Sequence, residues 1–363
     1  MYAYVGSFNY TGSEGIHLCE YDEGNGSLRY IKTMYPHINA GNLCVYKNLL
    51  LVTDESFSGH VYTFVIDAQT GELTERSCID TPGVNPSYIT IDSEGKYVIV
   101  THFSVGSPIK VLEKTANGYV SSLKGNDSPT CLYRLDDKNG LGELLDVGIH
   151  TPINGFMTMF HKAYESPDCS FFAENDLGDN QVYFFKIENE EIHYISNVVV
   201  GQGEDGPRHG AFHPRLPFLY LNYEHKSKIT RLDISDLSNV TIAEELELFD
   251  ADELLKQEDN QSEIMFSSDG KILYDFMRGK GVAYVVGING KDGRMELKQK
   301  LRLPGNDPRG IQYSPDKKYI LIDGHNSNRV YTLDIQEDGT LCYNGKECEM
   351  AHPACIAFYY PES

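Results

Sequence analysis

The chain has 363 residues and a formal net charge of −22, from 53 acidic and 31 basic side chains. Nucleic-acid binding requires a basic surface that neutralises phosphates, so this charge argues against a nucleic-acid partner and against an anionic membrane surface. No apolar run approaches the roughly 18 residues needed to span a bilayer, and the 25 Tyr, 16 Phe and 33 Gly favour β structure.

The start of the chain and its cysteines favour a cytoplasmic protein. Met1 leads directly into a strand-like segment, Tyr2–Gly6, without the basic segment that opens a secretory signal. Eight cysteines are scattered along the sequence and form no Cys-x-x-Cys pair. This pattern predicts free thiols, several of them inside strands, in a reducing compartment.

Short β-strands separated by turns follow one another from the N-terminus. The first segment supplies three strands, and the unit that comes next repeats along the chain. Its clearest copy has a first strand at Asn85–Ile91, a turn at Asp92–Lys96 and a second strand at Tyr97–Val100. A longer third strand follows, and a Gly-x-Leu turn leads into the fourth. Third strands are clearest at Val61–Asp67, Val182–Phe185, Ile229–Asp233 and Val330–Asp334.

The unit recurs about every 45 to 55 residues, which is typical of four-stranded propeller blades. Two segments exceed this period. We expect the first, Lys124 to Asn154, to be an extended loop, and the second, Asp250 to Asn260, to form a helical turn or two. The units start near Asn42, Pro86, Thr158, Pro207, Ser262, Pro308 and Pro353.

The two ends of the chain complete each other. The C-terminus ends on a lone first-type strand, Ala354–Phe358. Placed innermost in the first blade, this strand gives seven complete blades and leaves no open edge between the first and the last. We therefore predict one all-β domain over residues 1–363, a seven-bladed β-propeller of four-stranded antiparallel blades whose ring the C-terminal strand closes. The absence of Trp excludes the WD type.

Propeller geometry brings the starts of first strands and the ends of second strands to one face, around the central channel. For any single polar residue there, a water-facing loop position is an equally good interpretation. Several arginines together in so acidic a chain instead predict a small anionic ligand held by fork-like hydrogen bonds. The residues at first-strand starts are His161, Arg208–His209, Glu263 and Arg309; those at second-strand ends are Asp54–Glu55, His102, Asp176, Glu224–His225, Arg278 and His325.

Other motifs carry little weight. Gly201–Gly206 has the glycine spacing of a dinucleotide fingerprint, but it precedes a strand, so we interpret it as a loop between blades. No zinc-binding histidine motif and no Gly-x-Ser-x-Gly occurs. The interleaved arginines also disfavour a divalent cation, and we predict neither a metal nor a cofactor.

Several short motifs, taken together in their order along the chain, resemble those of the seven-bladed propeller lactonase family. This family includes bacterial 6-phosphogluconolactonases and, more distantly, fungal carboxymuconate cyclases. The motifs are Tyr4–Ser7, Asn85–Ser87, Asp176–Val182, Gly206–His209, Glu263–Ile264, Arg278–Gly279 and Pro308–Gly310. The resemblance implies His161, Arg208, Glu224 and Arg278 as active-site residues, with Glu263 and Arg309 at the same channel mouth. The chain departs from the family where Met159 replaces a histidine and where second strands end on His102, Tyr223, Met277 and Gly324.

The resemblance further implies a cytosolic hydrolase of 6-phosphogluconolactone or a related aldonolactone, in carbohydrate metabolism. Glu224 or His161 would serve as the base, while Arg208 and Arg278 would stabilise the oxyanion or hold an anionic group. Arg309 would assist and Glu263 would orient an arginine. Substrate-binding roles would also fall to His102, Asp176 and His325.

Three alternatives remain open at this point. The same residues could serve a lyase or isomerase acting on another sugar-derived or unsaturated acid. The propeller could be a non-catalytic binding platform, and the Arg–Glu pairs could be structural bridges between blades.

Overall fold

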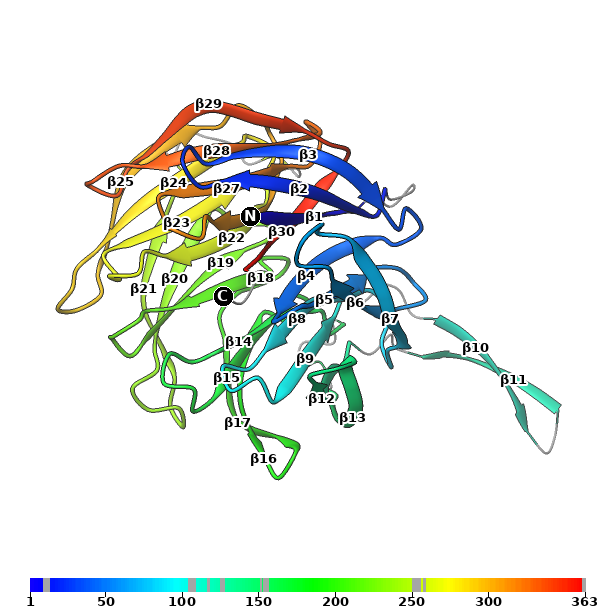
Figure 1. The fold of residues 1–363 in the computed structure, drawn as a ribbon. Coiled ribbons are helices and arrows are strands. Elements are labelled where there is room, and N and C mark those ends of the chain that lie inside the picture. Colours follow the sequence, from blue (N-terminus) through cyan, green and yellow to red (C-terminus); the bar gives the residue numbers. More distant parts are fainter. Residues whose placement is uncertain are drawn as a thin grey trace.

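The computed structural model describes residues 1–8, 14–103, 109–115, 118–124, 128–150, 152, 157–249, 256 and 259–360. These residues form thirty β-strands and no helix. Seven antiparallel sheets of four strands are arranged in a ring, and the two remaining strands pair as a separate hairpin (Figure 1). The predicted seven-bladed β-propeller is confirmed.

The blades follow the chain in order, each starting from its innermost strand. Blade 1 contains β30 (Pro353–Tyr359), β1 (Tyr2–Ser7), β2 (Ile16–Asp22) and β3 (Ser27–Met34). Blade 2 contains β4 (Ala40–Tyr46), β5 (Leu49–Asp54), β6 (His60–Ile66) and β7 (Leu73–Asp80), and blade 3 contains β8 (Pro86–Ile91), β9 (Tyr97–His102), β12 (Thr130–Asp136) and β13 (Gly140–Gly148).

Blades 4 to 7 are uninterrupted in sequence. Blade 4 contains β14 (Phe160–Glu165), β15 (Phe172–Asp176), β16 (Gln181–Glu188) and β17 (Glu191–Val199), and blade 5 contains β18 (Pro207–Phe212), β19 (Phe218–Tyr223), β20 (Lys228–Asp233) and β21 (Thr241–Glu247). Blade 6 contains β22 (Gln261–Phe266), β23 (Ile272–Met277), β24 (Val282–Ile288) and β25 (Met295–Arg302), and blade 7 contains β26 (Pro308–Tyr313), β27 (Tyr319–Gly324), β28 (Arg329–Ile335) and β29 (Leu341–Glu349).

The C-terminal strand closes the ring, as the sequence predicts. β30 runs antiparallel to β1, with Tyr359 opposite Tyr2 and Cys355 opposite Gly6. On its other side β30 packs between β26 and β4, so the seven innermost strands contact one another all round the channel. Closure gives the first and the last blade a neighbouring blade on each side, so the ring has no gap.

Hydrophobic packing between neighbouring blades holds the ring together. The second strands β5, β9 and β23 are buried at every position, because a blade covers each of their faces. The outermost strand β17 instead alternates between exposed and half-buried positions. The buried side chains gather into seven clusters around the ring.

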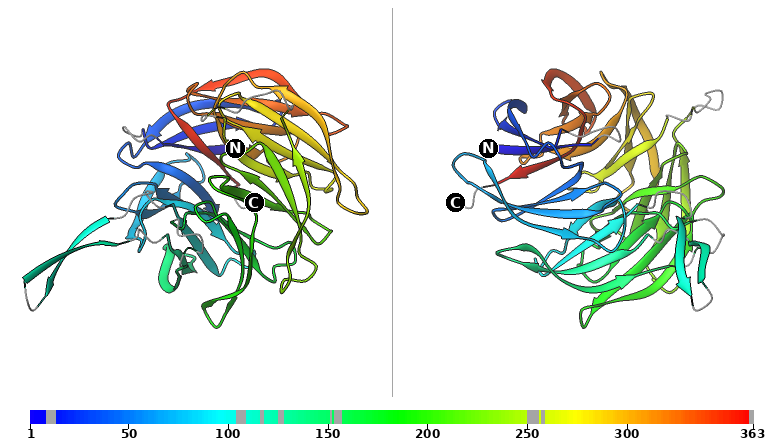
Figure 2. Two further views of the ribbon diagram at one scale, coloured as in Figure 1. Left: turned by 180° about the vertical axis from the view of Figure 1, so that it is seen from behind. Right: turned by 90° about the vertical axis from the view of Figure 1, so that its right-hand side faces the viewer.

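The predicted loop from Lys124 to Asn154 is wrong for most of its length. Residues 130–148 form β12 and β13, the two outer strands of blade 3. The extra length lies earlier, between β9 and β12, where β10 (Ile109–Thr115) and β11 (Gly118–Lys124) form a hairpin that projects from the ring (Figures 1 and 2). Residues 125–127, 151 and 153–154 lie outside the described part.

Several other predictions concern the surface and the loops. The helical turn predicted within Asp250–Asn260 falls mainly on residues 250–255 and 257–258, outside the described residues. Gly201–Gly206 lies between β17 and β18, as expected of a loop between blades.

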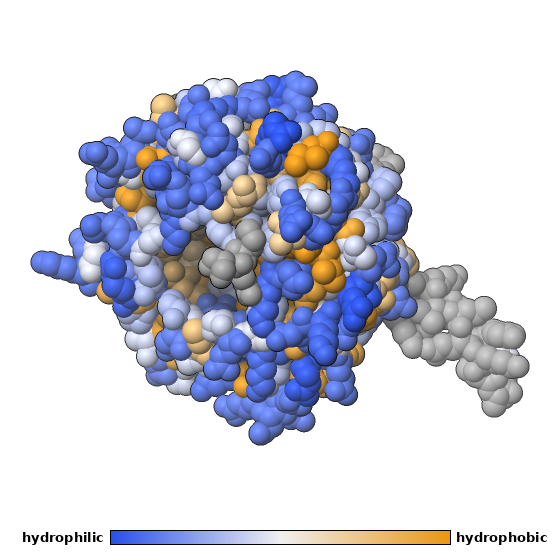
Figure 3. Space-filling model, in the orientation of Figure 1, coloured by the Kyte–Doolittle hydropathy of each residue, from blue (hydrophilic) through white to orange (hydrophobic). Residues whose placement is uncertain are grey.

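All eight cysteines are free thiols. In the described part, no helix is long and apolar enough to cross a membrane, and the face drawn in Figure 3 is mostly hydrophilic.

Candidate active site

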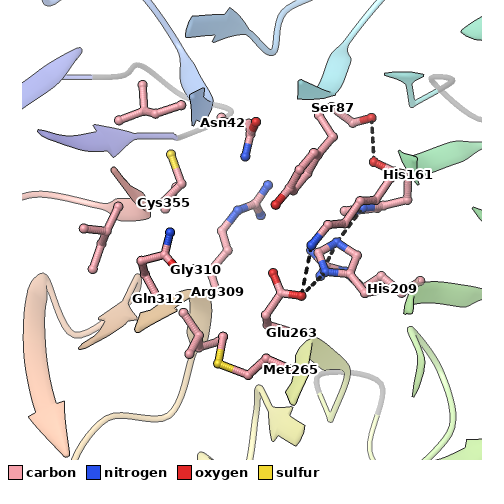
Figure 4. A pocket seen from close by; sticks show the side chains of 18 of the residues that line it. Asn42, Ser87, His161, His209, Glu263, Met265, Arg309, Gly310, Gln312 and Cys355 are labelled. Atoms are coloured by element: carbon pink, nitrogen blue, oxygen red, sulfur yellow. Dashed lines mark hydrogen bonds and ion pairs between the residues drawn. The ribbon is translucent and has the colours of Figure 1, made fainter. Parts of the chain in front are cut away.

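A cavity of about 290 Å³ occupies the central channel, and all seven innermost strands line it (Figure 4). The lining residues lie on these innermost strands, and Glu55 joins them from the end of β5. Its polar and charged members are Asn42, Glu55, Ser87, Tyr88, His161, Lys162, Arg208, His209, Glu263, Arg309, Gln312 and Tyr313.

A bulge at the start of the innermost strand turns these side chains into the cavity. In blade 4 the pairing of β14 with β15 shifts between Phe160 and Ala163, so His161 and Lys162 have no partner in the ladder. The shift recurs in blade 5 around Arg208–His209, in blade 6 around Ser262–Glu263 and in blade 7 around Arg309–Gly310. Such bulges bend the strand and redirect side chains, which is why they recur beside functional sites.

Glu263 is the centre of one charged group. Its Oε1 lies 2.8 Å from His209 Nδ1 and 3.3 Å from Lys162 Nζ, and it accepts the backbone N–H of Ile264 at 3.2 Å (Figure 4). Burial raises the pKa of this carboxyl, but His209 and Lys162 outweigh burial and hold the pKa well below its usual range. Burial likewise disfavours the ammonium of Lys162, yet Glu263 and Tyr88 raise its pKa. We therefore describe Glu263 as a carboxylate and Lys162 as its cation.

His161 stands beside this group as a neutral imidazole. Its Nδ1 lies 3.0 Å from Nε2 of His209, and the two rings meet edge to face with centroids 4.8 Å apart. Burial lowers the pKa of His161 well below its ordinary value, and the charge of Arg208 lowers it further. Burial also lowers the pKa of His209, to about 3. Both rings are consequently neutral imidazoles at neutral pH.

Glu224 is the centre of a second charged group, between two arginines. Its Oε2 lies 2.8 Å from Arg208 Nε, and its Oε1 accepts a hydrogen bond from Arg278 Nη2. Burial opposes ionisation of Glu224, but Arg278 and Arg208 lower its pKa to about 2. Arg208 also connects the two groups, because its Nη1 lies 3.2 Å from Nε2 of His209. Its own pKa is lowered to about 10, chiefly by burial.

Arg309 is held more loosely than Arg208 and Arg278. Its guanidinium lies over the ring of Phe8, 4.0 Å from the centroid, and its ion pair with Glu55 is long, at 3.5 Å. Burial raises the pKa of Glu55, while Arg309 and Arg208 oppose that shift. Gly310 beside Arg309 allows the close packing, because a Cβ there would lie 2.3 Å from Asp323 Oδ2.

Of the nine predicted site residues, His161, Arg208, Glu263 and Arg309 line the cavity, and Glu224 and Arg278 are joined to them through the ion pair of Glu224 with Arg208. The other three do not line the cavity, because their polar atoms serve neighbouring loops. The buried ring of His102 contacts the carbonyl oxygen of Pro129 through Nδ1 at 2.8 Å. Oδ1 of Asp176 accepts the backbone N–H groups of Met159, Gly178 and Asp179.

His325 has a supporting position. Its Nε2 lies 2.6 Å from the carbonyl oxygen of Phe8, and its Nδ1 lies 3.3 Å from Asp307 Oδ2. It thereby helps to hold Phe8, the ring on which Arg309 rests. The substrate-binding roles predicted for His102, Asp176 and His325 do not fit these surroundings.

Further residues line the cavity without a role in the predicted site, and of these His209 and Glu55 are predicted only to lie at the channel face. Lys162 and His209 directly follow His161 and Arg208, so a bulge that exposes two successive side chains would have identified them. Tyr88 occupies the corresponding region of β8. Of the adjacent pair at the end of β5, Glu55 lines the cavity, whereas Asp54 turns back to accept the backbone N–H of Asn39.

The donor set of the cavity suits an organic anion better than a metal ion. Among the described residues, no group of three His, Cys, Asp or Glu is arranged to hold a metal. The carboxylates at the centre of the site are instead engaged by lysine, arginine and histidine, which leave little room for a second cation. Guanidinium groups bind carboxylates and phosphates through paired hydrogen bonds.

Comparison with known proteins identifies the family. The model of the family described as "Lactonase, 7-bladed beta-propeller" matches residues 2–358, almost the whole chain. The chain belongs to this family. Membership makes it an enzyme of the lactonase type, a carboxylic ester hydrolase.

Individual relatives are distant but match over their full length. The chain is 23% identical over 366 residues to the 6-phosphogluconolactonase of Bacillus subtilis, covering 98% of each protein. It is 24% identical to the 6-phosphogluconolactonase of Formosa agariphila, covering 90% of each. The solved structure of the periplasmic gluconolactonase of Pseudomonas aeruginosa matches with a TM-score of 0.83 at 19% identity, covering 99% of each chain, and shows the shared fold.

Proposed function

We propose that this lactonase hydrolyses a sugar lactone that carries an anionic group, 6-phosphogluconolactone or a related aldonolactone. The observation that carries the proposal is the composition of one buried cavity, which combines a neutral histidine with arginines and lysine. The names of the Bacillus and Formosa relatives support the substrate class. The eight free thiols favour a cytoplasmic place of action.

His161 is the better of the two candidate bases. Glu224 is bound by two guanidinium groups and its pKa is lowered to about 2, so it has little tendency to take a proton. His161 is unprotonated and lines the cavity, where a water molecule and a lactone carbonyl can approach it. General-base catalysis by such a group contributes about 10²–10⁴-fold.

The proposed reaction needs one water molecule. His161 takes a proton as the water oxygen forms a bond to the lactone carbonyl carbon, and the carbonyl oxygen becomes an oxyanion. When the tetrahedral intermediate collapses, the bond from the carbonyl carbon to the ring oxygen breaks and the imidazolium returns its proton to that oxygen. The product is a hydroxy acid, which releases one proton as it ionises.

Arg208 is the residue best placed to stabilise the oxyanion. It is buried, it lines the cavity, and its contacts with Glu224 and His209 fix its orientation. A donor held in place before the reaction avoids reorganisation in the transition state, and losing one such donor costs about 10²–10³-fold in kcat. Arg278 supports Arg208 through the carboxylate that they share.

Arg309 is our candidate for the anionic group of the substrate. Its guanidinium points into the cavity (Figure 4), and its long contact with Glu55 leaves donors available for a phosphate or carboxylate. The lyase or isomerase alternative would use the same residues, but no specific contact in the cavity favours it. A binding platform would instead require a large exposed apolar surface.

The test is hydrolysis of phosphorylated and unphosphorylated sugar lactones by the purified protein, measured by acid release above the uncatalysed rate. Running the reaction in ¹⁸O-water should place one heavy oxygen in the product carboxylate. Turnover without ¹⁸O incorporation would favour the lyase or isomerase, and absence of turnover on every lactone would refute the proposal.

A further inference from the structure

The contacts around His209 fix which of its nitrogens carries the proton. Arginine has only N–H donors, so the approach of Arg208 Nη1 to within 3.2 Å of Nε2 requires that nitrogen to be an acceptor. At the other side of the ring, Nδ1 lies 2.8 Å from the Glu263 carboxylate, which only accepts. Both contacts are satisfied by one tautomer alone, in which Nδ1 is protonated and Nε2 is not.

The tautomer of His209 determines the tautomer of His161. Nδ1 of His161 lies 3.0 Å from the same unprotonated Nε2 of His209, so it supplies the hydrogen of that contact and shares the single lone pair of Nε2 with Arg208 Nη1. A neutral imidazole carries a single N–H, and Nε2 of His161 is therefore left with its lone pair. His161 belongs to the lining of the cavity, where that lone pair can receive a proton.

We propose that Glu263 and His209 are positioning residues that hold His161 in the tautomer required of a general base. The inference rests on the hydrolysis proposed above. The order is Glu263 to His209 to His161, in which each member sets the hydrogen-bonding role of the next. The carboxylate also stabilises the positive charge that appears on the imidazole pair when His161 accepts the proton of the attacking water.

The surrounding residues hold this chain of contacts rigid. The backbone N–H of His209 donates to Asn222 Oδ1 at 3.0 Å, and Asn222 in turn donates to the buried Asp275 at 2.8 Å. The ring of Tyr88 packs edge to face against that of His209, and the ammonium of Lys162 lies over the Tyr88 ring. The innermost strands of blades 3 to 6 thus converge on a single imidazole.

The charged groups that face the two histidines explain why the orientation matters. Arg208, Arg309 and Arg278 all disfavour protonation of His161, whereas the negative charge of Glu263 acts on it through His209. Without Glu263, the excess of guanidinium groups would make the imidazolium harder to form. The proposal therefore predicts effects on kcat and on its pH dependence, with little effect on substrate binding.

Substitutions at His209 test the proposal through kcat and KM measured between pH 5 and 9. In His209→Leu no acceptor remains for His161 Nδ1, and we expect kcat to fall about 10²–10⁴-fold with KM changed less than about threefold. In His209→Gln the side-chain amide can donate to Glu263 and accept from His161. The kcat of this variant should therefore be at least tenfold higher than that of His209→Leu. Glu263→Gln should lower kcat and alter the acid limb of the pH profile.

His213→Gln is the matched control. This buried histidine lies just beyond the same strand, and its Nδ1 accepts the backbone N–H groups of Arg215 and Leu216, away from the cavity. Its kcat should remain within about twofold of that of the unmodified protein. Equal kcat losses in His209→Leu and His209→Gln, or a loss confined to KM, would show that His209 has only a structural role.

Nitrogen-15 NMR of the ligand-free protein with labelled histidines separates this proposal from the proposed function. We expect unprotonated Nε2 on both His161 and His209, assigned by comparison with His161→Gln and His209→Gln. A proton on Nε2 of His209 would overturn the proposal even if the protein hydrolyses lactones. The expected tautomers in a protein without lactonase activity would refute the proposed function and the catalytic use of the tautomer, but not its geometry.

Discussion

Replacing Arg309 by alanine should selectively weaken the use of phosphorylated substrates. Its guanidinium rests on Phe8 and makes one long ion pair, at 3.5 Å to Glu55. A hydrogen bond from a charged group to a phosphate contributes about 1.5–3 kcal/mol, which corresponds to about 10- to 150-fold in affinity. The stability lost should be smaller, about 0.5–2 kcal/mol, because mainly a cation–π contact disappears.

The assay compares kcat/KM for 6-phosphogluconolactone and for unphosphorylated gluconolactone. For Arg309→Ala we expect the 10- to 150-fold loss on the phosphorylated lactone, mainly in KM, and a loss of less than about threefold on the other. Arg29→Ala, at an exposed position on the outer strand of blade 1, should leave both values unchanged. Equal losses of kcat/KM on the two lactones would refute an anion-binding role for Arg309.

Three further predictions concern the stability of the site. Glu224→Gln should lower the free energy of unfolding in urea by about 3–5 kcal/mol, because two buried guanidiniums lose their counter-charge. The control Glu347→Gln, at an exposed ion pair, should lower it by less than about 1 kcal/mol. Equal losses in the two variants would contradict the buried pairing of Glu224. The pKa of His209 is lowered to about 3, so its unfolded form binds a proton first, and His209 alone should lower the unfolding free energy by about 2 kcal/mol from pH 6.5 to 5, in addition to the losses from His161 and His102. That loss should shrink in His209→Gln, and an unchanged pH dependence would contradict a neutral buried ring. Gly310→Ala should cost about 1–3 kcal/mol in thermal or urea unfolding, because its Cβ would lie 2.3 Å from Asp323 Oδ2, whereas Gly290→Ala, in open space, should be neutral.

The ring could be predicted from the sequence because each copy of the repeat carries local signals of turns and strands. Turns, alternating strands and the lone strand Ala354–Phe358 fix the blade count and the closure. The prediction went wrong in blade 3, where the hairpin β10–β11 separates the second strand from the third. An insertion inside a blade lengthens the repeat without indicating which connection holds it, so the sequence predicts a loop where residues 130–148 form two strands.

The position of the site could be predicted from the sequence, but only some of the residues that form it could. The phase of the repeat identified His161, Arg208, Glu263 and Arg309 at the channel mouth. It could not distinguish cavity residues from strand-end residues such as Asp176, whose carboxylate caps backbone N–H groups. That choice depends on side-chain direction within a bulge, which is set by the register of strand pairing and not by the spacing of residues in the sequence.

The comparison of the unmodified protein with His161→Gln tests whether this imidazole is the base in lactone hydrolysis. The measurement is the rate of 6-phosphogluconolactone hydrolysis above the uncatalysed rate. We expect clear acceleration by the unmodified protein and a loss of about 10²–10⁴-fold in kcat for the variant, with circular dichroism showing that the variant is folded. A folded His161→Gln that hydrolyses the lactone at the unmodified rate would contradict this role of His161.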